Sequence, residues 1–142
     1  MKISIKLYWL SILIILISCT NGQTGPIEIT LDRDKCDRCQ MVISDKHFAT
    51  QVRGGPKNKV FLFDDIGCAV NWMNKQAWTD DAKIWVADYQ TGVLLEASIA
   101  HYVPEQITPM NFGFGATLKE VPTSIDFNAL KNQLLTNKHG SH

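Results

Sequence analysis

The chain has 142 residues, with 14 basic and 14 acidic side chains, and 45% of its residues are hydrophobic. This composition is typical of a folded globular domain and argues against a disordered chain. The sequence contains no basic stripe interleaved with aromatic residues, so no nucleic acid is expected among its partners.

The first 18 residues have the pattern of an export signal. Two lysines precede an apolar run over residues 7–17, which has the length of a signal-peptide core and is short for a membrane span. The run ends in "LISC", which resembles the bacterial lipobox, a motif cleaved just before a Cys that then becomes lipidated. We therefore predict a signal peptide over residues 1–18 and lipidation of Cys19. A signal peptide that is cut elsewhere, with Cys19 incidental, is the alternative.

The segment after Cys19 is expected to form one small domain. Removal of residues 1–18 takes away two lysines and no acids, which leaves 124 residues with 12 basic and 14 acidic side chains, a net charge of −2. That length suffices for one modest core. We predict a lipid-anchored tether over residues 19–26, the domain over residues 27–136 and a flexible tail over residues 137–142. The Cys19 anchor would hold the domain on the lipid bilayer of the cell envelope, facing the periplasm.

Alternation of apolar and polar residues, separated by turn residues, predicts antiparallel strands. Strands are expected at five places in chain order: residues 26–31, 47–53, 59–64, 83–89 and 93–97. The sequences "GGPKN" and "QTG" predict turns that join the second strand to the third and the fourth to the fifth. Residues 100–121 contain several Gly and Pro residues and are expected to form short strands joined by loops.

Two helices are expected. Ile66, Ala69, Val70 and Met73 recur at the spacing of one helix face, and Asp64 or Asp65 is placed to cap that helix. Near the C-terminus, Ser124 is the expected N-cap of a helix whose apolar positions include Ile125, Leu130 and Leu134. Together these elements predict a small α+β domain with antiparallel hairpins.

The sequence "KCDRCQM" carries the strongest chemical signal. Cys36, Cys39 and Met41 present two potential thiolates and one thioether within six residues. Soft thiolate and thioether donors favour Cu(I), and an extended segment would point Cys39 and Met41 to the same side. Met110, in the shaped loop "TPMNFGFG", is the best candidate for a third sulfur ligand from elsewhere in the chain.

Other interpretations of the same cysteines remain open. A zinc site requires four ligands, and the sequence offers no second Cys pair or His pair. A thioredoxin-like site places its Cys-x-x-C at the start of a helix, whereas the sequence after Cys39 favours extended structure. A plain Cys36–Cys39 disulfide would block copper until it is reduced. With Cys19 lipidated, three cysteines remain, and this odd count is a second indication of metal ligation.

The other candidate residues have simpler explanations. Cys68 is expected to be a buried thiol rather than a ligand, and Met73 a core residue. His101 is expected to be structural, and the tail histidines His139 and His142 lack a defined site. Asp64 and Asp65 are interpreted as helix caps rather than as an acid/base pair. No nucleophile, phosphate-loop or zinc-protease signature is present, so no enzymatic activity is expected.

Four blocks of the sequence resemble the NosL-type accessory proteins of nitrous oxide reductase. They occur in order between about Asp34 and Leu118: "KCDRCQMVISDKHFATQV", "FLFDDIGCAVNWM", "KIWVADYQTG" and "AHYV" followed by "TPMNFGFGA". The lipobox at Cys19 fits the same family. One departure is Gln40, where the family often has Gly.

The resemblance implies a fold, a ligand set and a function. It implies two small ββαβ-like units and a periplasm-facing lipoprotein that binds Cu(I). The ligands it implies are Cys39 and Met41 first, then Met110, with Cys36 less certain. The expected partners are a membrane ABC-type transporter assembly and nitrous oxide reductase, whose copper centre would receive the ion. Two further hypotheses, a thiol–disulfide protein that uses Cys36 and Cys39 and a chaperone for another cuproprotein, stay open.

Overall fold

The computed structural model describes residues 22–137. The predicted signal peptide, Cys19, His139 and His142 lie outside the described residues, so their roles stay predictions. Within residues 22–137, no helix has both the length and the apolar character that a membrane span requires.

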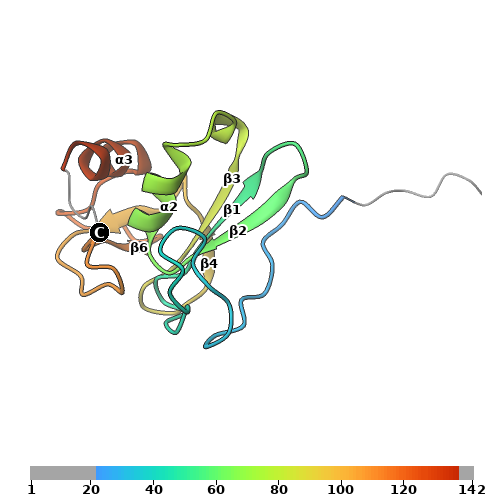
Figure 1. The fold of residues 1–142 in the computed structure, drawn as a ribbon. Coiled ribbons are helices and arrows are strands. Elements are labelled where there is room, and N and C mark those ends of the chain that lie inside the picture. Colours follow the sequence, from blue (N-terminus) through green and yellow to red (C-terminus); the bar gives the residue numbers. More distant parts are fainter. Residues whose placement is uncertain (1–21, 138–142) are drawn as a thin grey trace, which may run out of the picture.

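A four-stranded antiparallel sheet forms the larger layer of the domain, with strand order β2-β1-β3-β4 (Figure 1). Its strands are β1 (Thr50–Gly54), β2 (Lys59–Phe63), β3 (Lys83–Ala87) and β4 (Leu94–Glu96). β1 joins β2, and β3 joins β4, through the two turns that the sequence predicts. The hairpin predictions are therefore confirmed, although the strands are shorter than expected.

A second, two-stranded sheet pairs β5 (His101–Val103) with β6 (Gly115–Thr117) in antiparallel orientation. The long loop between these strands contains Met110. The helices are α2 (Ile66–Met73) and α3 (Phe127–Thr136), with a short 3-10 turn, η2 (Thr79–Asp81), before β3. Two helices and two antiparallel sheets confirm the α+β class.

Helix α2 connects the two halves of the domain, since it contacts β1 and β2 on one side and α3 on the other (Figure 1). The four residues of its predicted apolar face are all at most 5% exposed. Asp65 is the N-cap, and its carboxylate accepts a hydrogen bond of 3.0 Å from the backbone N–H of Gly67. This bond satisfies one of the amide groups that have no partner within the helix. The cap fixes the start of α2 at Ile66, and Asp64 lies directly before the cap residue.

Two local predictions are wrong. Residues 26–31 form no strand. Their alternating side chains lie along an irregular segment, which the Gln51 amide holds by accepting from Ile27 N at 2.9 Å and donating to Ile27 O at 2.7 Å. Ser124 does not cap α3 because its hydroxyl bonds to the backbone of Val121, and Asp126 caps the helix through Ala129 N. In both places a hydrogen bond between a polar side chain and the backbone overrides the structure that the local pattern suggests.

Candidate metal centre

Three cysteines and one aspartate from two distant segments meet beside α2. One ligand atom from each of Cys36, Cys39, Asp64 and Cys68 lies within 4.8 Å of all the others. We call these four residues the Cys3Asp cluster. Four ligands at about 2.3 Å from a tetrahedral ion are about 3.8 Å apart, so the donors stand close to the spacing that a shared ion requires.

The loop of residues 35–42 supplies two of the four donors. Its ends are joined by a bridge between Lys35 and Val42, and Cys36 N donates to Met41 O at 2.9 Å. Gln40, at the tip, has a φ of 64°, in the left-handed region that favours glycine. This conformation explains why a glycine suits the position, and Gln40 adopts it while donating from its amide to Cys36 O at 3.3 Å.

Asp37 fixes this loop to the sheet. Its backbone N–H donates to Leu62 O, and its carboxylate accepts from Leu62 N, both at 2.7 Å. Because Leu62 belongs to β2 and Asp64 follows that strand directly, this paired contact sets Cys36 and Cys39 opposite Asp64. The loop is thereby held by backbone geometry and not only by its side chains.

The two adjacent aspartates have different tasks. Asp65 caps α2, as predicted, and its second carboxylate oxygen accepts from the Thr108 hydroxyl at 2.5 Å and from Met110 N at 3.3 Å. Asp64 is 3% exposed, and the Cys39 thiol donates to its two oxygens at 3.5 and 3.7 Å. The prediction that Asp64 or Asp65 caps the helix is therefore confirmed for Asp65, and the Asp64 carboxylate faces Cys39 instead.

The two buried thiols share a proton unequally. A hydrogen bond from Cys68 lowers the pKa of Cys36 to about 6 against the opposing effect of burial, and the N–H of Cys39 donates to the same sulfur at 3.5 Å. The pKa of Cys68 is raised, first by that hydrogen bond and then by burial. Arg38 donates from Nη1 to the Cys68 sulfur at 3.6 Å. The hydrogen bond between the two buried thiols therefore favours the thiolate form at Cys36 over that at Cys68.

Cys39 is the accessible thiol of the cluster. It is half-buried, whereas Cys36 and Cys68 are fully buried. Burial first, and then the nearby Cys36 and Asp64, raise the pKa of Cys39 to about 11. A cation entering the cluster offsets this repulsion and displaces the proton, since metals bind the thiolate form of cysteine.

The two methionines of the predicted site are placed differently. Met41 lies near the end of the loop and is 55% exposed, so it does not act as core packing. Met110 is partly buried against the core, and its backbone is tied to Asp65. Thr108 N-terminal to it and Gly113 C-terminal to it are joined by a hydrogen bond of 3.2 Å. The structure thus brings the Met110 segment to the start of α2, and ligation by either methionine stays a prediction.

Two members of the cluster, Asp64 and Cys68, are not among the metal ligands that the sequence predicts. Cys68 is buried, as expected, and the structure places it against Cys36, so whether it ligates a metal stays a prediction. Asp64 supplies a fourth donor atom, so the cluster has the number of ligands that a tetrahedral zinc site requires. The available signal was the block "FDDIGC": a doublet of acids where one suffices to cap a helix, followed by an unpaired cysteine. His101 lies in β5 and is not part of the cluster.

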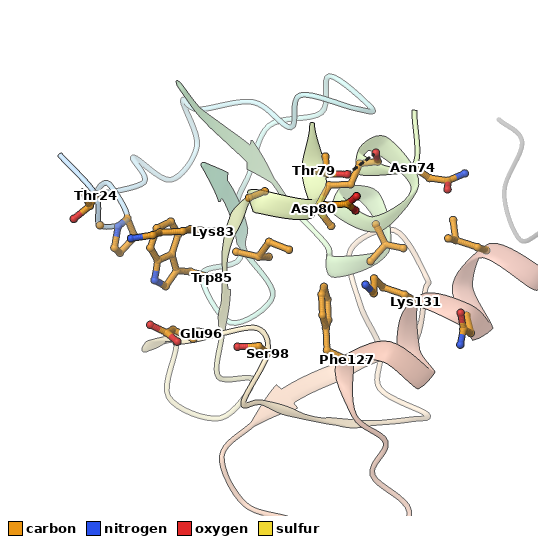
Figure 2. A pocket seen from close by; sticks show the side chains of 18 residues that line it. Thr24, Asn74, Thr79, Asp80, Lys83, Trp85, Glu96, Ser98, Phe127 and Lys131 are labelled. Carbon is orange, nitrogen blue, oxygen red and sulfur yellow. Dashed lines mark hydrogen bonds between the residues drawn. The ribbon is translucent and has the colours of Figure 1, made fainter. Parts of the chain in front are cut away.

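Away from the Cys3Asp cluster, the described part of the chain has a surface groove. It is a half-open groove of about 850 Å³, lined by residues from α2, η2, β3 and α3 and by residues 24–26. Phe127 and Lys131 line it on one side of β3, and Trp85 and Lys83 lie on the other side of that strand (Figure 2). None of the Cys3Asp cluster lines this groove. The candidate metal centre is therefore a tight cluster of donors and not a ligand-sized cavity.

The fold has a match among solved structures. The crystal structure of the copper chaperone NosL from Shewanella denitrificans aligns with a TM-score of 0.54 and 18% sequence identity, covering 77% of this chain and 89% of that one. The two chains share a fold. No protein-family model and no curated protein matches the sequence. The structural likeness agrees with the resemblance that the Cys-x-x-C-x-M and "FDDIGC" blocks indicate.

Proposed function

We propose that this protein binds Cu(I) at the Cys3Asp cluster and passes it to a partner protein, without catalysing a reaction. The observation that carries the proposal is the meeting of three free thiols and a carboxylate within 4.8 Å. Thiolates are the protein ligands that Cu(I) prefers. The fold shared with a copper chaperone supports the same assignment.

The graded exposure of the sulfur atoms suits transfer. Cys39 and Met41 are accessible, whereas Cys36 and Cys68 are fully buried. A partner's ligand can approach Cys39 and Met41 first, so Cu(I) can change hands one bond at a time. Met110 is the further sulfur ligand in this proposal.

The biological setting in the proposal follows the family resemblance. The protein would be held at the periplasmic face of a membrane by lipidated Cys19. It would deliver Cu(I), with an ABC-type transporter assembly, for the copper centre of nitrous oxide reductase. A gene neighbourhood that encodes that reductase and its transporter would support this acceptor, and one that encodes another cuproprotein would redirect the proposal.

A thiol–disulfide function is the second candidate, and the lowered pKa of Cys36 favours it. Against it, Cys36 is fully buried and the Cys-x-x-C pair lies in a turn, not at the start of a helix. An external disulfide would have to react first with Cys39, whose pKa is raised.

The deciding experiment is a Cu(I) titration of the purified protein against a colorimetric Cu(I) chelator under anaerobic, reducing conditions. Stoichiometric competition that is lost in Cys39→Ser and in Cys36→Ser supports the copper site. If the wild-type protein takes no Cu(I) from the chelator, the proposal fails. Turnover of a model disulfide by the same protein would then favour the redox function.

A further inference from the structure

The positively charged side chain of Arg38, in the loop of residues 35–42, contacts the Cys3Asp cluster. Arg38 lies between Cys36 and Cys39 in the sequence, and its Nη1 donates to the Cys68 sulfur at 3.6 Å. It therefore reaches from the 35–42 loop to α2. Hydrogen bonds between charged groups are stronger than neutral ones, and this bond strengthens when Cys68 loses its proton.

The same guanidinium also reaches the segment that carries Met110. The Arg38 Cζ lies 5.7 Å from the centroid of the Phe112 ring, at the distance of a cation–π contact. The Phe112 ring in turn packs on α2 at Gly67, since a Cβ at that position would come within 2.0 Å of the Phe112 Cγ. Arg38 thus contacts the two segments that face its own loop.

The position of Arg38 is imposed by backbone contacts on both sides of it. Asp37 makes its paired contact with Leu62, and Gln40 N donates to Cys36 O at 2.9 Å. Arg38 is half-buried, so its charge is less screened by water than that of a surface arginine. A buried anionic cluster requires such a counter-charge when its thiols give up protons to a metal.

We propose that Arg38 is a positioning residue of the copper site. It holds the Cys68 sulfur in place as a ligand and keeps Phe112, and with it the Met110 segment, packed against the loop of residues 35–42. This inference rests on the proposed function, because it assumes that the cluster binds Cu(I). Arg38 acts through Cys68 and Phe112 and makes no bond to the ion.

The test is a double-mutant cycle in Cu(I) affinity, measured by competition with the chelator. Loss of a charge-assisted hydrogen bond predicts that Arg38→Gln weakens Cu(I) binding about tenfold or more, and Arg38→Lys restores part of that loss. In a Cys68→Ala background the same Arg38→Gln change is expected to cost less than about twofold, because the bond it removes is already gone. Arg33→Gln, at an exposed arginine that bonds Thr30, is the matched control and leaves the affinity unchanged.

Three results would overturn the inference or its premise, and they differ from one another. Equal losses from Arg38→Gln with and without Cys68 would show that Arg38 does not act through that thiol. An unchanged affinity in Arg38→Gln would show that it does not act at all. Failure of the wild-type protein to compete would instead refute the proposed function. Thermal unfolding of each metal-free variant checks its fold, and if Arg38→Gln does not fold, Arg38→Lys takes its place in the cycle.

Discussion

The thiol of Cys39 lies 3.5 Å from the nearer carboxylate oxygen of Asp64, a residue 25 positions further along the chain. Both side chains are held from the backbone: Cys39 by the loop that Asp37 ties to β2, and Asp64 by the start of α2. A soft and a hard donor therefore share one site. Their separate contributions are open to measurement because they prefer different metals.

Asp64→Asn removes the carboxylate charge with little change in volume. A hard oxygen ligand contributes more to Zn(II) than to Cu(I). We expect the variant to lose about tenfold or more in Zn(II) affinity, because the Asp64 oxygen would be a direct ligand of that ion. The Cu(I) affinity should fall less than about threefold, because the sulfur atoms would hold that ion. Competition titrations with chelators for each ion measure both values. Equal losses for the two ions would contradict this division of roles.

Met41→Ala tests whether the exposed thioether is a ligand. Because Met41 is 55% exposed, its truncation is expected to change the free energy of unfolding by no more than about 0.5 kcal/mol. Cu(I) binding should nevertheless weaken in the chelator competition. Val93→Ala, at a residue that is 61% exposed and is not a member of the Cys3Asp cluster, is the control. An affinity equal to that of the wild type would remove Met41 from the site.

Gly67→Ala tests the close contact between Phe112 and α2. Alanine in a helix is normally favoured over glycine by about 1 kcal/mol, so the substitution would be expected to stabilise an ordinary helix. Here the new Cβ would lie 2.0 Å from the Phe112 ring and must displace it. We expect a net destabilisation of about 1–3 kcal/mol, measured by urea unfolding. Gly22→Ala, where nothing lies within 4 Å, is the control, and a Gly67→Ala protein as stable as wild type would refute the contact.

Asp88→Asn tests the turn between β3 and β4. Burial by itself would raise the pKa of Asp88, but hydrogen bonds from the backbone N–H groups of Gln90 and Thr91, and from threonine hydroxyls, lower it overall. A carboxyl group with a lowered pKa in the folded state stabilises the fold above its unfolded pKa. That contribution is lost as the pH falls through the folded pKa.

The stability difference between wild type and Asp88→Asn should therefore shrink on acidification from about pH 4 downward. Urea unfolding of both proteins over a series of pH values measures it. A difference that stays constant down to about pH 2 would show that the Asp88 charge contributes nothing to the turn.

Local patterns predicted most of the secondary structure because those elements depend on neighbouring residues. The turns "GGPKN" and "QTG" determine their hairpins, and the spacing of Ile66, Ala69, Val70 and Met73 determines α2. The errors occur where a polar side chain had several backbone partners within reach. Ser124 turned to Val121 and left the cap of α3 to Asp126.

The sequence by itself determined the α+β class, the hairpins, α2 and the chemical character of the Cys36–Met41 segment, since each depends on residue types at short spacing. Only the tertiary structure decided that Asp64 and Cys68 join Cys36 and Cys39. That juxtaposition requires the 35–42 loop to pair with Leu62 of β2 and α2 to begin directly after its N-cap Asp65. Contacts between residues 25 or more positions apart follow from how the sheet and the helix pack, and no local spacing encodes them.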